Sequence, residues 1–332
     1  MRVLVTGATG FLGLHIIDEL LEHGHEVRAL VRSSSNLREL ARRERVHVTE
    51  GDMHAPESLA RAVSGIEAVI HCAGGGKVLR EGDFREQNTE TTANLLEAID
   101  HAGKSIKHLV LISSIAACGP ARREEIPLTS SSAPAPRSLY GQAKLAAESL
   151  CLERRERMCV TIVRPAAIYG PGDTRFLPMI KSVQRGLLPL PPGRAVSLVY
   201  GKDCANAVVR CLEIEHPSGR TYFVDDGQAR SWAELGQHIH TELGSTAQSK
   251  RLLTVAIPSS VIYLAGLLNE AKARVTGSPT MLTRDKWRDG RENYWVCASE
   301  KTREELGWAP TMNLDSGLKE TIRWYRQEGW IR

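Results

Sequence analysis

The 332-residue sequence lacks the features that mark membrane-spanning and nucleic-acid-binding proteins. It contains no run of about 18 apolar residues, so we exclude a spanning helix. Neither sign of charge dominates, because 43 lysines and arginines are scattered among 39 aspartates and glutamates. That balance indicates neither a nucleic-acid partner nor an acidic membrane surface.

Cysteine pairs and metal-binding patterns are absent as well. The seven cysteines are an odd number without a CxxC pair, as is typical of reduced cysteines that pack like small hydrophobic residues. The first residues read as a strand entering a glycine turn and not as a signal peptide. His101 and His108, like His238 and His240, lack the spacing of metal ligands. We therefore expect a soluble, cytoplasmic protein without a metal site.

The first half of the chain alternates short apolar runs with helical patterns. Helices are predicted at about 12–23, 35–44, 56–64, 88–102 and 138–157. The strands predicted around them are Arg2–Thr6, Val27–Val31, Val46–Glu50, Ala68–His71, His108–Ile112 and Thr161–Arg164. Apolar strands separated by helices predict the α/β class, with a doubly wound (Rossmann) parallel sheet covered on both faces. Such a sheet binds ligands at the carboxyl ends of its strands.

The pattern changes after about residue 172. Helices are predicted at about 174–186, 202–214, 231–243, 258–275, 298–306 and 314–328, with short strands at Val196–Val199 and Thr221–Val224. Two segments, 119–137 and 188–193, read as loops because of their prolines and glycines. We expect a dinucleotide-binding domain over residues 1–171, with return segments near 194–230. A smaller, mainly helical substrate lobe is expected over residues 172–332.

A glycine turn follows the first strand directly. Gly7, Gly10 and Gly13 have the spacing GxxGxxG between a strand and a helix. Gly7 permits a tight turn, Gly10 lets the backbone approach a pyrophosphate, and Gly13 lets the helix pack closely on the strand. A glycine pattern alone is common, but its position at the first βα turn favours dinucleotide binding over a plain glycine-rich turn.

The end of the second strand indicates which dinucleotide binds. Folds that take NAD usually carry an acidic residue there for the ribose 2′-hydroxyl, whereas this strand ends in Arg32. A guanidinium suits a 2′-phosphate, so we predict NADP(H) over NAD(H), the alternative being a solvated arginine. Asp52 and Met53, after the third strand, are candidates to hold the adenine, although Asp52 also fits a turn.

A tyrosine, a lysine and a pair of strand-end serines form a candidate proton-transfer group. Tyr140 and Lys144 stand at positions i and i+4 of a predicted helix, so their side chains share a face. The lysine cation stabilises a phenolate, which suits the tyrosine to acid–base work near neutral pH. Ser113 and Ser114 end the fifth strand, where a hydroxyl can donate to a carbonyl oxygen that gains negative charge. YxxxK alone is common, but the order of glycine turn, strand-end serine and YxxxK indicates an oxidoreductase.

These motifs and others resemble those of the extended short-chain dehydrogenase/reductases, within the NAD-dependent epimerase/dehydratase superfamily. The resemblance covers essentially the whole chain. It rests on TGATGFLG, GDM at 51–53, HCAG at 71–74, NTETTANLLEA at 88–98, LISSIAACG at 111–119, YGQAKLAAE at 140–148, VRPAAIYGPGD at 163–173, LVYGKDCANAV at 198–208, YFVDDGQARSWAEL at 222–235 and SEKTREELGWAP at 299–310.

The resemblance implies roles for particular residues. Ser114, Tyr140 and Lys144 would form the catalytic group, with Asn88 steadying the site and Lys144 also binding the nicotinamide ribose. The residues that would line the dinucleotide are Gly7, Gly10, Phe11 and Leu12 at the pyrophosphate, Cys72, Ala73 and Gly74 at the adenosine side, and Pro165 and Ile168 at the nicotinamide side.

Departures from the family pattern narrow the substrate. Nucleotide-sugar epimerases of the family usually carry an asparagine where this chain has Ala167, and sugar dehydratases carry an Asp-Glu pair where it has Ile115-Ala116. The chain looks more like the 3β-hydroxysteroid dehydrogenase and dihydroflavonol reductase branch, whose Val-Arg at the second strand end matches Val31-Arg32. That branch implies an NADP(H)-dependent oxidoreductase acting on a ketone or alcohol of a hydrophobic molecule. The alternatives are a nucleotide-sugar epimerase or dehydratase and a catalytically silent NADP-binding regulator.

The segment Pro258–Val275 bears on the substrate and on partners. Eight residues from Val261 to Leu268 carry no charge, which is more apolar than a one-faced surface helix needs. We consider a helix packed into the second lobe, or one that lids an apolar pocket and also makes a peripheral membrane contact. Members of the family are monomers or dimerise through helices corresponding to 88–102 and 138–157, and the sequence leaves both states open.

Overall fold

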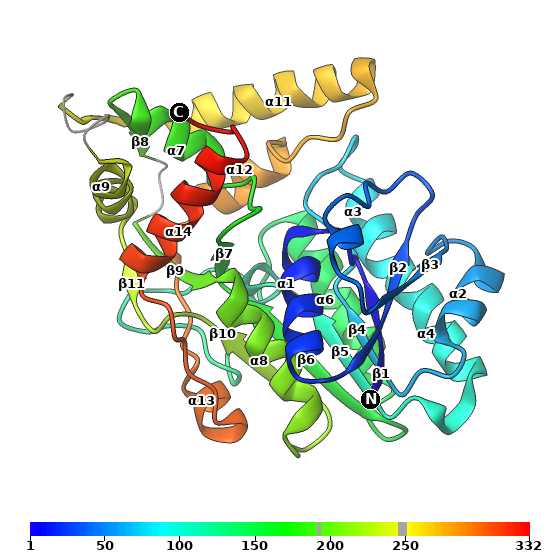
Figure 1. Ribbon diagram of the computed structural model, residues 1–332. Coiled ribbons are helices and arrows are strands. Elements are labelled where there is room, and N and C mark those ends of the chain that lie inside the picture. Colours follow the sequence, from blue (N-terminus) through cyan, green and yellow to red (C-terminus); the bar gives the residue numbers. More distant parts are fainter. Residues whose placement is uncertain (191–193, 245–250) are drawn as a thin grey trace.

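A seven-stranded parallel sheet forms the centre of the computed structural model, which describes residues 1–190, 194–244 and 251–332 (Figure 1). The strand order is β10-β6-β5-β4-β1-β2-β3. The strands are β1 Arg2–Thr6, β2 Glu26–Val31, β3 Val46–Glu50, β4 Ala68–His71, β5 His108–Ile112, β6 Cys159–Pro165 and β10 Arg220–Val224. This sheet, with helices on both faces, confirms the predicted doubly wound α/β class. The order reverses between β1 and β4, the point at which such sheets bind ligands.

Two apolar cores lie on opposite faces of the sheet. Successive residues of a strand point to opposite faces, so Val3 and Val5 enter one core while Leu4 enters the other. Helices α1 (Phe11–Glu22) and α8 (Gly201–Glu213) cover the first face. The second face is covered by α2 Pro56–Val63, α4 Thr91–His101 and α6 Leu139–Leu152.

One helix predicted in the first half is wrong. Residues 35–44 contain only a single 3₁₀ turn, Leu40–Arg42. The Asn36 side chain accepts a hydrogen bond from the Arg38 amide at 3.0 Å, a local turn that competes with a helix. The other helices of this half follow the prediction within a few residues, although α6 ends at Leu152 and residues 86–90 form a π-helical turn before α4. Three short elements complete this half: α3 Asp83–Arg85, a 3₁₀ turn Gly103–Ser105 and α5 Ile115–Cys118.

The second half builds a smaller lobe with its own apolar core. The helices of this half other than α8 are α7 Leu177–Gln184, α9 Trp232–Leu243, α11 Ser259–Thr276, α12 Arg284–Gly290, α13 Glu300–Leu306 and α14 Leu314–Gln327. Of these, α13 packs against β10 and α8 and not in the smaller lobe. The strands of the smaller lobe are β7 Ala167–Tyr169, β8 Leu187–Leu190, β9 Ala195–Tyr200, β11 Ala229–Arg230, β12 Leu253–Ala256 and β13 Tyr294–Trp295. No helix among the described residues has the length and apolarity needed to cross a bilayer.

The loop predicted at 188–193 is corrected in part. Residues 187–190 form β8, which pairs in parallel with β12 in a two-stranded ribbon. Its one proline, Pro189, is tolerated because a two-stranded ribbon consists only of edge strands. Residues 191–193 lie outside the described part of the chain.

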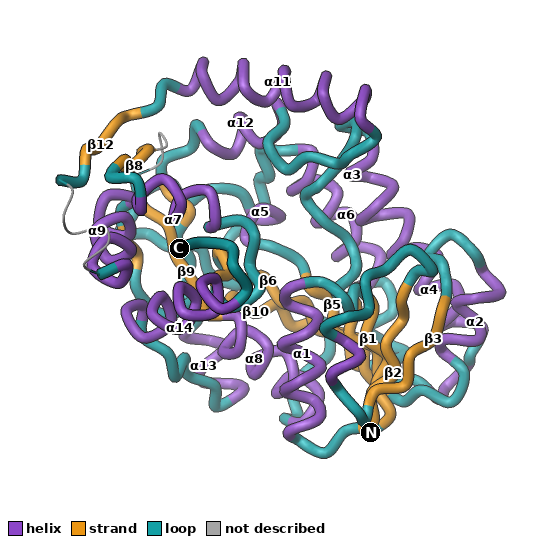
Figure 2. The backbone as a smooth tube through the Cα atoms, turned by 45° about the horizontal axis from the view of Figure 1, so that its top comes forward, coloured by secondary structure: helices purple, strands orange, loops and turns teal. Residues whose placement is uncertain are grey.

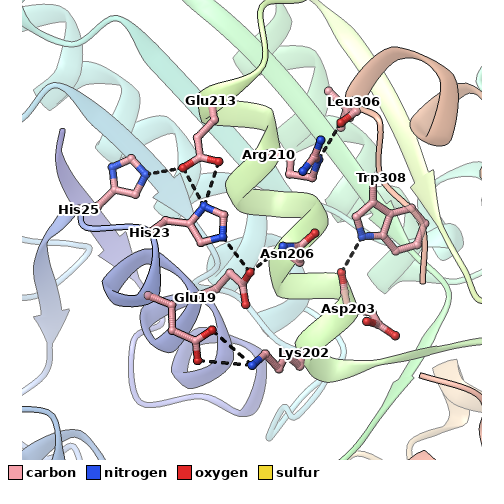
Figure 3. A network of polar contacts seen from close by, with 11 residues as sticks. Glu19, His23, His25, Lys202, Asp203, Asn206, Arg210, Glu213, Leu306 and Trp308 are labelled. Carbon is pink, nitrogen blue, oxygen red and sulfur yellow. Dashed lines mark hydrogen bonds and ion pairs between the residues drawn. The ribbon is translucent and has the colours of Figure 1, made fainter. Parts of the chain in front are cut away.

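Polar contacts join the late helix α8 to α1 at the start of the chain (Figure 3). The Glu213 carboxylate accepts hydrogen bonds from His23 at 2.9 Å and His25 at 3.0 Å. Asn206 donates to Glu19 at 2.6 Å. Together with β10, which pairs with β6, these contacts tie the return segment into the nucleotide-binding sheet.

Candidate functional site

The glycine turn lies at the point where the strand order reverses. Gly7 has φ +69°, a left-handed conformation that favours glycine, and a Cβ there would lie 2.7 Å from the Ala73 nitrogen. A Cβ on Gly13 would lie 2.2 Å from the Gly7 carbonyl oxygen, so α1 can approach the turn only with glycine at that position. The N-terminus of α1 therefore faces the space at the strand ends, as an anion site requires.

The end of β4 forms the opposite wall of this space. The Ala73 amide donates to Thr6 Oγ1 at 3.1 Å, which fixes Cys72–Gly74 beside the glycine turn. Burial raises the pKa of the Cys72 thiol to about 11, so this cysteine stays protonated and contributes no thiolate.

Lys144 and Asn88 converge on Gly74. Lys144 is buried, and its Nζ donates to the Ile112 carbonyl oxygen at 3.1 Å. A Cβ on Gly74 would lie 3.2 Å from that Nζ and 2.6 Å from Asn88 Oδ1. Asn88 donates to the Phe84 carbonyl at 2.9 Å, while its buried Oδ1 has no partner among the described residues. An unpaired buried acceptor beside a lysine suits a site that a hydroxyl-bearing ligand completes.

Tyr140 lies in the first turn of α6, four residues before Lys144. The Ser138 side chain begins this helix by accepting from the Gly141 amide at 3.1 Å. The Tyr140 ring packs edge-on against Phe84, with centroids 6.0 Å apart. Val78, Leu139 and Ala143 belong to the same apolar cluster.

The structure distinguishes the two strand-end serines. Ser113 is buried and donates to Glu148, whose carboxylate also holds Arg164 in a buried ion pair at 2.6 Å. Ser114 is half-buried and accepts from the Ala116 amide at 3.1 Å, which caps the short helix α5. That bond uses one lone pair of the Ser114 oxygen and leaves its O–H to donate elsewhere.

Other residues predicted to contact the cofactor differ in their exposure. Arg32 is exposed at the end of β2, and its amide donates to Ser35 Oγ at 3.1 Å. Asp52 accepts from the His54 amide at 2.9 Å, the turn geometry that the sequence left open, and Met53 packs against the second core. Leu12 and Ile168 are buried in the first core, so only their backbones are open to a ligand.

Arg175 was not predicted from the sequence. Its guanidinium lies 5.9 Å from the Phe11 ring centroid and 3.2 Å from the Asp173 carboxylate. Its position places a cation beside the start of α1. The signal was present in the run GPGDTR, but nothing in that run shows which element the arginine folds against.

Asp285 was missed as well, because helix α12 was not predicted. This buried carboxylate accepts from the Leu139 amide at 2.7 Å and the Tyr140 amide at 3.2 Å. Arg288 donates to it at 2.8 Å. The second lobe thus supplies an acceptor to the N-terminus of the helix that carries Tyr140 and Lys144.

The glycine turn lies where the strand order of a doubly wound sheet reverses, and one helix beside it carries a tyrosine and a buried lysine. This combination defines a dinucleotide-dependent enzyme. The family model described as the NAD dependent epimerase/dehydratase family matches residues 3–224, more than half of the chain. The chain therefore belongs to that family. It is an NAD(P)-dependent enzyme of the extended short-chain dehydrogenase/reductase type, as predicted.

Known proteins support this assignment. The chain is 29% identical over 339 residues to a ceramide reductase of Caulobacter vibrioides, covering 99% of this chain and 96% of the relative. It is 28% identical to a UDP-glucose 4-epimerase of Vibrio cholerae, covering 98% and 95%. A 3-beta-hydroxysteroid dehydrogenase of Mycolicibacterium neoaurum is 26% identical, covering 98% and 91%. The crystal structure of gox2253 superimposes with a TM-score of 0.80 at 26% identity, covering 100% of this chain and 99% of its own.

Proposed function

We propose that the protein is an NADPH-dependent reductase of a ketone in a hydrophobic small molecule. The observation that carries this proposal is that the side chains of Lys144 and Asn88 both approach Gly74. Tyr140 lies on the same helix as Lys144, and Ser114 follows strand β5. The apolar packing of Tyr140 with Val78, Phe84 and Leu139 supports an apolar substrate. We further propose that residues 1–171, with return segments near 194–230, bind the dinucleotide and that residues 172–332 form the substrate lobe.

Each of these side chains has a distinct part in the proposed reaction. When bound, the nicotinamide supplies a hydride to the carbonyl carbon. The Ser114 hydroxyl donates a hydrogen bond to the carbonyl oxygen, and Tyr140 transfers its phenolic proton to that oxygen. The ammonium of Lys144 stabilises the phenolate that remains, until water returns a proton to it. Asn88 and Lys144 would hold the nicotinamide ribose through its hydroxyls.

Support for NADPH comes from the end of β2. Arg32 is exposed there and is followed by the exposed Ser33 and Ser34, so a cation and two hydroxyls would be available to a 2′-phosphate. Support against a nucleotide-sugar substrate comes from Ala167, which packs against the apolar core of the second lobe and offers no polar group to a sugar nucleotide. The epimerase activity of one relative keeps that reaction as the second candidate.

The chemistry is tested with aliphatic, aromatic and steroidal ketones, each incubated with NADPH and followed at the nicotinamide absorbance. Tyr140→Phe keeps the ring and removes the proton, so turnover should fall by about 10²–10⁴-fold while cofactor affinity is retained. Tyr294→Phe, at a half-buried tyrosine of β13, is the matched control and should retain activity. Normal turnover by Tyr140→Phe, or turnover of UDP-sugars and of no ketone, would refute the proposal.

Cofactor preference is tested by calorimetric titration. The unmodified protein should bind NADPH more tightly than NADH by about 1–3 kcal/mol, the range for a charged hydrogen bond. Arg32→Ala should remove most of that difference and leave NADH affinity unchanged, whereas Arg38→Ala, at another exposed arginine, should change neither. Equal affinities in the unmodified protein would contradict the assignment.

A further inference from the structure

Helix α11 exposes its large apolar side chains. The exposed fractions reach 55% for Leu264 and 62% for Leu268. Val261, Tyr263, Leu267 and Val275 on the same helix are also exposed, and so are Leu253 and Val255 on β12. In Figures 1 and 2 the helix lies along the outer edge of the second lobe, and the chain leads from β12 into it. We call these eight residues the α11–β12 surface.

The amphipathic pattern of α11 is inverted. Its buried residues are Gly266, Glu270 and Ala273, which face α12. A Cβ on Gly266 would lie 2.7 Å from the backbone carbon of Thr283, so the inner face needs a residue without a side chain. A surface helix of a globular protein normally buries its large apolar residues and exposes its small and polar ones. Here the large apolar side chains are the exposed ones, and an exposed apolar region of this kind is typical of a binding surface.

The charge of the same segment identifies that partner. Residues 251–291 contain seven lysines and arginines and three acidic residues. All three acids are buried: Glu270 pairs with Arg284, Asp285 with Arg288, and Asp289 with Lys286. Lys272 and Arg274 remain exposed on α11 itself. The outer face of the segment is therefore apolar and cationic, although the charges of the whole chain are nearly balanced.

We propose that the α11–β12 surface docks on a membrane whose headgroups are anionic. An interfacial helix inserts apolar side chains such as leucine and valine between the lipid headgroups. Lysines and arginines at its border then lie at the level of the phosphate groups. A second copy of this chain would cover the leucines but would offer Lys272 and Arg274 no acidic side chain of the same segment, because Glu270, Asp285 and Asp289 are all buried.

The α11–β12 surface lies near the candidate site, so docking would bring that site close to the membrane. Helix α12 packs between α11 and the N-terminus of α6, where Asp285 accepts from the Tyr140 amide. A substrate that is itself a membrane lipid would therefore leave the bilayer within one helix layer of Tyr140. Only this use of the surface rests on the proposed reductase function, whereas docking itself does not.

Docking is tested by flotation with vesicles of phosphatidylcholine alone or mixed with phosphatidylglycerol. The full chain should float with the mixed vesicles. Leu264→Glu combined with Leu268→Glu should lower the vesicle-bound fraction by at least about tenfold, because two carboxylates replace the inserted side chains. The matched control is Ile126→Glu, which alters a residue that is 61% exposed in another part of the molecule and should float normally. Circular dichroism establishes that each variant is folded.

A second pair of variants isolates the charge. Lys272→Glu with Arg274→Glu should reduce binding to the mixed vesicles by at least about tenfold, since each cation near an anionic surface contributes about 1 kcal/mol. Arg61→Glu with Lys107→Glu changes the net charge equally on exposed residues of the nucleotide-binding half and should leave binding unchanged.

Three results would overturn the proposal: no flotation of the full chain, equal loss in the controls, or a stable dimer that only the leucine variants dissociate. Because flotation needs neither substrate nor cofactor, these results are independent of the ketone assay. Vesicle binding without ketone reduction would refute only the proposed reaction.

Discussion

His71 is a buried histidine that forms hydrogen bonds through both ring nitrogens. The Thr6 hydroxyl accepts from the Ala73 amide and forms a second hydrogen bond, 2.7 Å long, with His71 Nδ1. Thr92 donates to the Asn88 carbonyl and accepts from His71 Nε2 at 3.0 Å. Burial, assisted by the Lys144 charge, lowers the pKa of His71 from 6.5 to about 3. The hydrogen bonds of this ring thus connect β1 and β4 to the turn that carries Asn88.

The lowered pKa of His71 predicts acid sensitivity. A histidine with a depressed folded pKa contributes stability that is present above the unfolded pKa of 6.5 and is lost as the pH falls towards the folded pKa of about 3. Between these values the free energy of unfolding should fall by about 1.4 kcal/mol per pH unit on account of this residue. Urea unfolding of the unmodified protein and of His71→Asn at pH 7, 6 and 5 measures this contribution. The difference between their free energies of unfolding should shrink as the pH falls. The same substitution at the exposed His101 should show no such trend, and parallel curves for His71→Asn would contradict the prediction.

Among the elements, α12 has the most direct effect on the candidate site. Asp285→Ala removes a buried acceptor from the Leu139 and Tyr140 amides, so the first turn of α6 should loosen while the second turn, with Lys144, stays in place. We expect kcat to fall by roughly tenfold or more, since a small misplacement of a proton donor is costly, with little change in cofactor affinity.

The control for this prediction is Asp83→Ala. Asp83 also accepts from two backbone amides, those of Leu79 at 3.0 Å and Arg80 at 2.9 Å, but it does not hold α6. Both variants should lose stability, and only Asp285→Ala should lose turnover. Equal kcat values in the two variants would show that Asp285 stabilises the fold but does not position Tyr140.

The sequence predicted those elements whose pattern is local. All seven strands of the large sheet were located, because most of them are apolar runs bounded by turn residues and β3 (VHVTE) carries alternating β-branched residues. The helix predicted at 35–44 is wrong for a local reason. The Asn36 side chain accepts a hydrogen bond from the backbone, and hydrophobic periodicity does not reveal such a bond. Strand β8 could not be predicted, since Leu187–Leu190 is extended only through its pairing with β12, more than sixty residues later.

The candidate site divides in the same way. The glycine turn, Tyr140 and Lys144 follow spacing rules within one turn or one helix, and could be read from the sequence. Asp285 reaches the Leu139 amide across 146 positions, and such a contact has no sequence signal of its own. The unpaired acceptor Oδ1 of Asn88 likewise could not be predicted, because the fold alone brings Gly74 and Lys144 beside it.

At the scale of the whole molecule, Asp203 fixes the C-terminal segment to α8. Its buried carboxylate accepts from the Thr311 amide at 3.1 Å, the Thr311 hydroxyl at 2.6 Å and the Met312 amide at 3.0 Å. Trp308, itself buried, donates to the Asp203 carbonyl (Figure 3). These bonds position α14 over the lobe and close its apolar core.

Asp203→Asn should therefore lower the free energy of unfolding by about 2–4 kcal/mol, because an amide NH₂ would face donors in a buried place. Asp315→Asn serves as the control, since its pair with His238 is exposed and should contribute less than about 1 kcal/mol. Urea denaturation of the three proteins decides the matter, and similar midpoints for all of them would show that the segment is held by apolar packing alone.

The return of the chain to the sheet affects how this protein is made. Strand β6 ends at Pro165, but its outer neighbour β10 is complete only at Val224, so translation must add 59 further residues before that edge can pair. At ribosomal rates this takes roughly 3 to 12 s. During that interval β6 presents an unpaired, mostly apolar edge, the kind of strand that recruits other chains. Slow codons between these strands would lengthen this period of exposure, and a nascent chain arrested there should be a preferred client for chaperones.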